Sequence, residues 1–211
     1  MSAISAGGTM ELKGKVKLAS KIDKVKRDKN GVTVFYNQHQ QDSFDEVIFA
    51  THADQALAML DNPTPEERSI LGKFEYVPVH SVLHQDDRIL SGKYQRGIYC
   101  EYVGSDIKAA SILDGHLTRI INELEPNQAL KEPLMVTFDP KQEIDPKLIL
   151  CERHWKLPKL RPQDLHNKVK MRSIQGNHHT WFCGTDSTVT GHEGAILSGL
   201  VIANALGASY P

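Results

Sequence analysis

The sequence predicts an α/β protein with mixed helices and strands, in which one domain is interrupted by a second, strand-rich domain. Three observations lead to this fold class. Residues 15–60 alternate like strands and then take helical spacing, residues 75–158 are mostly extended, and residues 163–206 combine helices with one short strand. This order indicates a chain that leaves its first domain, builds an insertion and returns.

Two strands are expected near the beginning of the chain. Asn30-Gly31 separates two alternating runs and is typical of a tight hairpin turn, because both residues tolerate a positive φ. The alternating apolar residues are Val16, Leu18, Ile22, Val32, Val34 and Tyr36. Farther along, residues 47–50 form a continuous apolar run, which predicts a strand buried on both faces, as in a parallel sheet.

Two helices are expected after this strand. Apolar residues three and four apart predict a helix over residues 53–60, which ends before Pro63. Thr64 then has the position of an N-cap, with Pro65 at the first helical position and Glu66 and Glu67 in the first turn. The second helix therefore begins at Pro65.

The middle of the chain predicts a sheet. Strands are expected at residues 77–83, 97–103, 134–138 and 148–155, a helix at residues 118–124, and loops at residues 126–133 and 140–146. His80 and His84 are four residues apart, a spacing that holds metals on a helix. In a strand the two rings lie too far apart for easy chelation, so we expect no metal site.

The end of the chain, residues 179–208, is the most informative stretch. It predicts a short strand at residues 180–183, a turn at Gly184, and a helix at residues 193–206 entered through Gly191 and His192. A polar helix is expected just before it, at residues 163–172. A helix N-terminus can hold an electron-rich ligand group, because its N–H groups are unpaired and its dipole end is positive. Small residues on its first turns fit either a flat cofactor ring or close packing of an ordinary C-terminal helix on a sheet.

Composition excludes several classes of protein. The 211 residues include 25 Lys and Arg against 26 Asp and Glu, which gives no electrostatic reason to expect a nucleic-acid or membrane partner. Cys100, Cys151 and Cys183 are too few and too far apart for a disulfide framework or a zinc site, so a reducing cytoplasm is expected. We expect no spanning helix and no signal peptide, and residues 1–11 read as a disordered or artificially added start.

Residues 179–208 resemble the C-terminal flavin-binding motif of the FAD-dependent amine oxidases. The matching residues are Gly184, Thr185, Asp186, Gly191, Glu193, Gly194, Ala195, Ser198 and Gly199. The resemblance implies that Asp186 meets the ribityl chain and that the backbone of residues 193–195 faces the pyrimidine edge of the flavin ring. His192 is the histidine expected beside the flavin, unless it only bonds its own loop.

A second match lies in residues 21–60, which resemble the family's three-stranded meander and the strand that returns to its FAD domain. By this resemblance Ala50 and Thr51 lie at a strand end beside the dinucleotide, and Ile22 binds adenine through its backbone. Together the matches cover most of residues 12–208. They are closest to bacterial proteins described as predicted NAD/FAD-binding and amine-oxidase-like.

The sequence also departs from the family. None of its fifteen glycines forms the G-x-G-x-x-G pattern that brings a pyrophosphate to a helix N-terminus. No lysine occurs in residues 80–87, where the amine oxidases place one near flavin N5, and the loop at residues 186–191 lacks their paired aromatics. We expect a partial FAD-binding domain at residues 12–60 and 172–208, without the N-terminal Rossmann βαβ unit, and a substrate-type insertion at residues 61–171.

The functional hypothesis is the C-terminal portion of a flavin-containing amine oxidase or related FAD-dependent oxidoreductase that is not competent alone. FAD and a small-molecule substrate belong to the complete protein, with FAD absent or weakly bound here, and the catalytic residues are unknown. Two alternatives are a non-catalytic binding or dimerisation module and one chain of a split flavoenzyme. We expect residues 47–50 and 180–183 to share a sheet. We also expect exposed apolar surface that a homodimer or the N-terminal half would cover.

Overall fold

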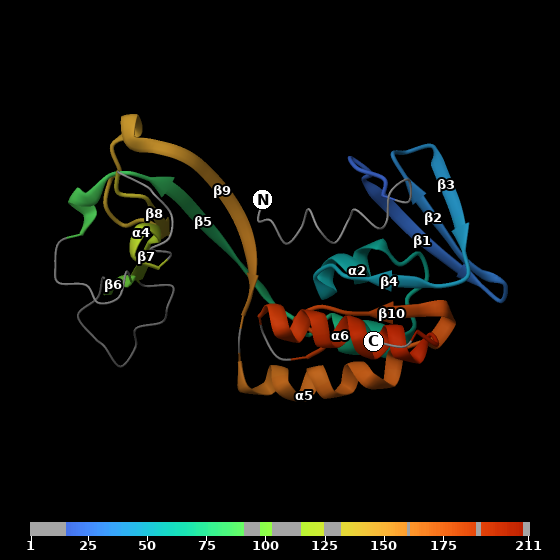
Figure 1. Cartoon of the computed structure of the whole chain (residues 1–211). Coiled ribbons are helices and arrows are strands. Elements are labelled where there is room, and N and C mark those ends of the chain that lie inside the picture. Colours follow the sequence, from blue (N-terminus) through green and yellow to red (C-terminus); the bar gives the residue numbers. More distant parts are fainter. Residues whose placement is uncertain are drawn as a thin grey trace. The chain divides into compact units, whose positions relative to one another are not determined.

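The computed structural model describes residues 16–90, 98–102, 115–124, 132–159, 161–188 and 191–208 (Figure 1). The start predicted at residues 1–11 and most of the loop predicted at residues 126–133 lie outside these ranges. The described residues form two compact units. One contains the chain up to Glu75 and from Arg161 onward, and the other contains Tyr76–Lys159.

The first unit begins with an antiparallel meander of three strands, β1 (Ile22–Asp28), β2 (Gly31–Tyr36) and β3 (Gln40–Phe44). The predicted hairpin is confirmed, but its first strand starts at Ile22, and the exposed Val16 and Leu18 precede it. Gly31 has a φ of 140°, and a Cβ there would lie 2.5 Å from the Phe44 carbonyl oxygen. The turn therefore requires glycine.

The second sheet of this unit is a parallel pair, β4 (Val47–Phe49) and β10 (Thr180–Phe182). This confirms that residues 47–50 and 180–183 share a sheet. Phe49 and Phe182 are buried and stack with their ring centroids 5.6 Å apart. The expectation of a β4 buried on both faces is wrong, because Ile48, which points to the other face, is 46% exposed.

The helices of the first unit are α2 (Ala53–Met59), α3 (Pro65–Leu71), α5 (Pro162–Lys170) and α6 (His192–Ala205), with short turns η3 (Met171–Ile174) and η4 (Asn177–His179). The predicted N-cap of α3 is confirmed: the Thr64 hydroxyl accepts a hydrogen bond from the Glu67 N–H, and the Glu67 carboxylate accepts one from the Thr64 N–H. This capping box satisfies two backbone donors that the helix itself leaves unpaired.

A buried ion pair connects the meander, α3 and β10. The Arg27 guanidinium donates to both carboxylate oxygens of Glu67, at 2.6 and 2.9 Å, and to the Thr180 hydroxyl at 3.2 Å. Burial raises the pKa of Glu67, but the hydrogen bonds from Arg27 and the Thr64 backbone outweigh it and leave the pKa below its usual value. α3 therefore belongs to the first unit.

The unit boundaries consequently differ from those expected at residues 60/61 and 171/172. They lie at Glu75/Tyr76 and after Lys159. In addition to the Arg27 contact, the Ser173 hydroxyl donates to Glu66, and Arg161 at the start of α5 donates to the Lys73 carbonyl and pairs with Glu75. Both α3 and α5 thus pack within the first unit instead of the insertion.

The second unit is an antiparallel sheet with the strand order β6-β7-β8-β5-β9. Its elements are β5 (Tyr76–His84), η1 (Asp87–Ile89), β6 (Ile98–Tyr102), β7 (Gly115–Ile120), α4 (Ile121–Leu124), β8 (Met135–Phe138), η2 (Pro146–Leu148) and β9 (Ile149–Pro158). Val82, Ile89 and Ile144 form its buried cluster. The four predicted strands are confirmed.

The helix predicted at residues 118–124 is wrong in its first half, which belongs to β7. Thr118 is fully buried and hydrogen-bonded to Thr137 of β8, at 2.8 Å between the hydroxyl oxygens. Leu117, Thr118, Arg119 and Ile120 alternate in burial, as strand residues do. Only Ile121–Leu124 are helical, so the pairing with β8 outweighed the helical spacing of the apolar residues.

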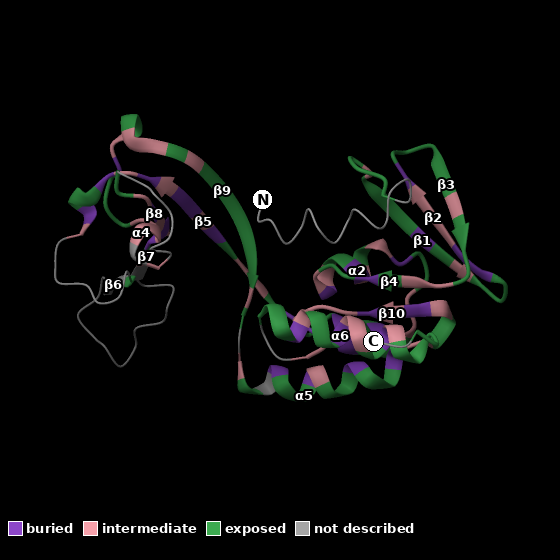
Figure 2. Cartoon of the chain, viewed as in Figure 1, coloured by how far each residue is buried: buried purple, intermediate pink, exposed green. Residues whose placement is uncertain are grey.

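Both long helices of the first unit carry exposed residues (Figure 2), and several of these are apolar. α6 buries its small residues Gly194 and Ser198, whereas Ile196, Leu197 and Val201 are 50 to 67% exposed. α5 buries polar residues and exposes two apolar ones, Leu165 at 68% and Val169 at 59%. The predicted exposed apolar surface is thus present. None of the described helices is long and apolar enough to cross a membrane.

Candidate functional site

The parallel pair brings the two predicted halves of the site to one edge. Because β4 and β10 run in the same direction, the residues that follow each strand meet there: Ala50 and Thr51 after β4, and residues 184–186 after β10. The Cys183 N–H donates to the Phe49 carbonyl at 2.9 Å and carries the ladder one residue beyond the strands. Ligands of open α/β sheets bind at this carboxyl edge.

Glycines in the loop between β10 and α6 face open space. Gly184 has a φ of 109° and Gly191 a φ of 97°, and a Cβ at either position would meet nothing within 4 Å. The same is true of Gly199 in the second turn of α6. The backbone at these positions is therefore accessible to a ligand, and the residues present fit a flat electron-rich group at the helix start.

The loop is tied to α6 at both of its described ends. The Gly184 N–H donates to the Ser198 hydroxyl at 2.8 Å, and that hydroxyl donates to the Ala195 carbonyl at 2.6 Å. The Thr188 hydroxyl donates to the Gly194 carbonyl at 2.6 Å. Ser198 is buried, so one side chain sets the distance between the glycine turn and the helix.

Asp186 connects the loop to α2. The residue is 7% exposed, and its carboxylate accepts a hydrogen bond from the N–H of Ala53, the first residue of α2, at 3.1 Å. The flanking His52 supplies no side-chain cap, so Asp186 takes that place from a distant part of the sequence. The contact with a ribityl chain that the resemblance implies stays a prediction, now for a carboxylate with a structural role.

The N-terminus of α6 presents its first backbone amides beside the loop. His192 and Glu193 are exposed and Gly194 is buried. Among the described residues, none accepts a hydrogen bond from the N–H of these three. The predicted residues Gly184, Thr185, Asp186, Gly191, His192, Glu193, Gly194 and Ala195 therefore form one loop and helix start, next to Ala50 and Thr51.

The remaining predicted residues lie elsewhere. Ile22 is at the start of β1 in the meander, not in the parallel pair. His80 and His84 are on β5, as the strand prediction requires. The His80 ring bonds Glu152 and stacks on His154, whereas the buried His84 bonds Thr137 at 2.7 Å.

Within the described ranges, no group of three or more His, Cys, Asp or Glu residues could hold a metal ion. Burial raises the pKa of the Cys183 thiol.

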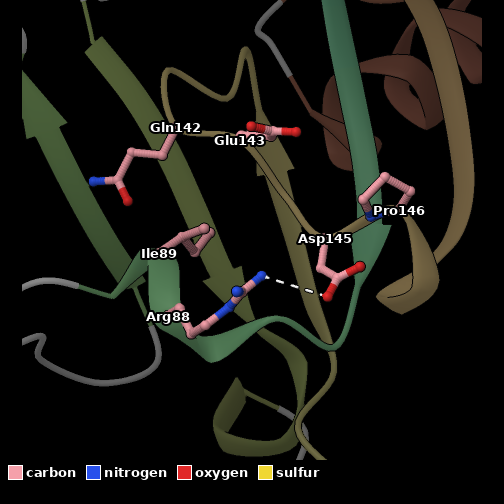
Figure 3. A pocket seen from close by; sticks show the side chains of 6 residues that line it. All are labelled: Arg88, Ile89, Gln142, Glu143, Asp145 and Pro146. Carbon is pink, nitrogen blue, oxygen red and sulfur yellow. Dashed lines mark ion pairs between the residues drawn. The ribbon is translucent and has the colours of Figure 1, made fainter.

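Two features were missed by sequence reasoning. One is Lys168 of α5, whose ammonium contacts the loop after β10. The other is a pocket of about 390 Å³ in the second unit, lined by Arg88, Ile89, Gln142, Glu143, Asp145 and Pro146 (Figure 3). Asp86 holds Arg88 through two hydrogen bonds, which keep the pKa of Asp86 well below its usual value. Neither feature has a local sequence motif, because each depends on residues from distant segments.

The strand edge, the glycine turn and the helix start lie together in one α/β unit. The chain belongs to the family of flavin containing amine oxidoreductases, whose family model matches residues 2–181. The loop and α6 lie beyond the end of that match, and their resemblance rests on their own motif and geometry. No curated protein matches the chain.

Solved structures with the same fold are about twice as long as this chain. A variant of putrescine oxidase is 11% identical with a TM-score of 0.63, and covers 98% of this chain and 52% of its own. A CLA-producing fatty acid isomerase from P. acnes is 11% identical with a TM-score of 0.60, and the match covers 90% of this chain and 48% of the isomerase. Cyclohexylamine oxidase from Brevibacterium oxydans IH-35A is also 11% identical, with a TM-score of 0.54, and the match covers 89% of this chain and 48% of the oxidase. This chain therefore spans about half the length of the structures that it resembles.

Proposed function

We propose that this chain forms the flavin-ring end of the FAD site in an amine-oxidase-like oxidoreductase. A second, glycine-rich nucleotide-binding segment completes the site, either joined to this chain or as a separate polypeptide. The observation that carries the proposal is the parallel pairing of β4 with β10, which places Ala50, Thr51 and the glycine turn beside the start of α6. The family match supports flavin as the ligand.

The residues of this edge would bind and orient FAD. The first amides of α6 and the positive end of its dipole suit an electron-rich ring edge, and Gly184 and Gly191 let the ring approach the backbone. When bound, FAD accepts a hydride equivalent from an amine or another C–H donor. The protein contributes orientation and electrostatics, and in the complete enzyme the second unit would select the donor.

The partner proposed for this chain is the glycine-rich segment itself. A parallel sheet is normally covered on both faces and rarely consists of two strands, and in the described residues β4 and β10 pair only with each other. The outward apolar residues of α5 and α6 need a cover of matching character. A segment of strands and helices as long as this chain would supply both, whereas a homodimer would cover the helices and leave the sheet at two strands.

The chain alone is expected to be colourless and inactive. Much of the affinity for a dinucleotide comes from the pyrophosphate anchor and its charge-assisted hydrogen bonds, and the glycine pattern for that anchor does not occur in these 211 residues.

We place the protein in the cytoplasm, because its three dispersed cysteines suit a reducing compartment.

The test is flavin binding with and without the glycine-rich segment. After incubation with FAD and desalting, the assembled protein should be yellow and this chain alone colourless. Asp186→Ala should weaken FAD binding by about 1–3 kcal/mol if its carboxylate also holds a ribityl hydroxyl. Circular dichroism first establishes that the variant is folded, since Asp186 also caps α2. Tight stoichiometric FAD on this chain alone, or none on the assembly, would refute the proposal.

A further inference from the structure

The loop that follows β10 is held from a third direction by a lysine. Lys168, in the last turns of α5, donates from Nζ to the carbonyl oxygen of Thr185 at 2.5 Å and to that of Thr188 at 2.8 Å. One ammonium group thus donates hydrogen bonds to two carbonyl oxygens of the same loop, three residues apart. Other bonds of this loop run to α6, to α2 through Asp186, and within the loop from Ser187 to the Gly184 carbonyl.

The surroundings of Lys168 differ from those of a lysine in an exposed surface ion pair. Its side chain is half-buried, and burial lowers its pKa, against the opposing effect of the Asp186 and Asp164 carboxylates. Asp164 is occupied by Arg161 and Asp186 by the Ala53 N–H, and Lys168 forms no ion pair among the described residues. Its hydrogen bonds therefore fix the backbone of the loop and do not merely balance a charge.

We propose that Lys168 is a positioning residue for the FAD site. Its ammonium turns the Thr185 and Thr188 carbonyls toward α5 and compensates their partial negative charge. The loop is thereby held with Gly184 facing open space, and its carbonyl oxygens are kept from an electron-rich ligand at the start of α6. This inference rests on the proposed function, and it adds a residue for which the sequence carried no motif.

The main test compares Lys168→Met with two other variants. Methionine keeps most of the aliphatic stem and removes both hydrogen bonds, and Lys168→Arg restores charge and donors. Lys170→Met is the matched control, because Lys170 lies on the same helix, is exposed, and has no recorded side-chain bond among the described residues. In the protein assembled with its glycine-rich segment, Lys168→Met should raise the Kd for FAD about tenfold or more, with Lys170→Met within about twofold of wild type and Lys168→Arg between the two.

Hydrogen exchange of the 211-residue chain gives a readout that does not depend on flavin. In Lys168→Met, the amides of Gly184 and Ser187 should exchange faster, because their bonds to Ser198 and to the Gly184 carbonyl rely on a fixed loop, whereas the amides of the meander should be unchanged. A general loss of stability would instead speed up amide exchange in both the loop and the meander.

The outcomes separate this inference from the proposed function. If the assembled wild type binds no FAD, the proposed function fails. If the wild type binds FAD and Lys168→Met binds it equally well, or if its exchange increases uniformly along the chain, Lys168 has no positioning role. If Lys168→Met does not fold, Lys168→Arg decides: the inference requires it to bind FAD more tightly than Lys168→Gln does, and equal affinities overturn it.

Discussion

The meander β1–β3 and the parallel pair β4–β10 lie in the same unit but are built in different ways. In the meander, neighbouring strands pair in sequence order through short turns, and its buried residues Val25, Val32 and Tyr36 come from the same short segment. The strands of the parallel pair come from segments far apart in the sequence, and they are joined by backbone pairing and by the stacked Phe49 and Phe182 rings. The meander thus depends on local sequence, and the parallel pair depends on partners far along the chain.

This difference shows which long-range contacts the parallel pair depends on. The contacts that connect the parallel pair and its loop to the rest of the unit include the Arg27–Glu67–Thr180 network, the Asp186 cap of α2 and the Lys168 bonds. Each joins segments that an unfolded chain keeps apart, so each must form for the cofactor edge to exist. Ile48 of β4 and the outward apolar residues of α6 are exposed in the described structure.

The largest effect is expected from breaking the buried ion pair. Arg27→Met should lower the free energy of unfolding by about 3–5 kcal/mol, because it leaves the Glu67 carboxylate buried without its partner. Urea denaturation followed by circular dichroism measures this value. The double variant Arg27→Met/Glu67→Leu should regain most of the loss. A loss below about 1 kcal/mol for Arg27→Met would show that the pair is not a main connection of this unit.

A local substitution in the meander should have a smaller effect. Gly31→Ala should cost about 2 kcal/mol, because φ is 140° and the new Cβ would clash with the Phe44 carbonyl. Gly199→Ala is the control. That glycine is helical with open space around it, so alanine should be neutral or stabilise by up to about 1 kcal/mol. If both variants melt like wild type, the turn does not determine the meander.

Removal of a helix cap should cost less again. Thr64→Ala removes the hydroxyl that accepts the Glu67 N–H and should reduce stability by about 1 kcal/mol. Thr64→Ser keeps the hydroxyl and should stay within a few tenths of a kcal/mol of wild type, by the same reasoning. Equal losses in the two variants would assign the effect to the methyl group and not to the cap.

The second unit provides a pH test of a buried polar group within one sheet. The Asp86 N–H donates to Nδ1 of the buried His84, so that nitrogen carries no proton. Burial lowers the pKa of His84, although the Asp86 carboxylate opposes this. The unfolded chain then binds the proton more readily, and stability should fall as the pH drops below about 6.5, the unperturbed histidine value. Tm measured from pH 7.5 to 5 should decline less steeply in His84→Gln, and parallel curves would contradict this role.

The elements could be predicted where the signals were local. The Asn30-Gly31 turn, the Thr64-Pro65 helix start and the apolar runs of β4 and β10 all act within a few residues. The helix predicted over residues 118–124 failed because the pairing of Thr118 with Thr137 decides the conformation of that segment. The domain boundaries failed for a similar reason, since the Arg27–Glu67 pair that holds α3 in the first unit joins segments 40 residues apart.

The candidate site was predictable as a motif but not as a set of contacts. The glycines and the helix start at residues 184–195 were expected together, and Ala50 and Thr51 were expected beside them because residues 47–50 and 180–183 were predicted to share a sheet. The structural role of Asp186 and the contribution of Lys168 could not be predicted, because both bonds cross from one helix or loop to another with no periodic pattern. Such contacts require the fold to be known first.

Hydroxyl-radical footprinting of this chain, with and without the proposed glycine-rich segment, tests the central claim most directly. Ile196, Leu197 and Val201 on α6 are exposed in the chain alone, and so is Phe44 in the meander, which serves as an internal reference. If the parallel pair and α6 are completed by that segment, the three α6 residues should lose reactivity in the complex while Phe44 keeps it. A complex in which the α6 residues remain as reactive as before, or no complex at all, would contradict the account.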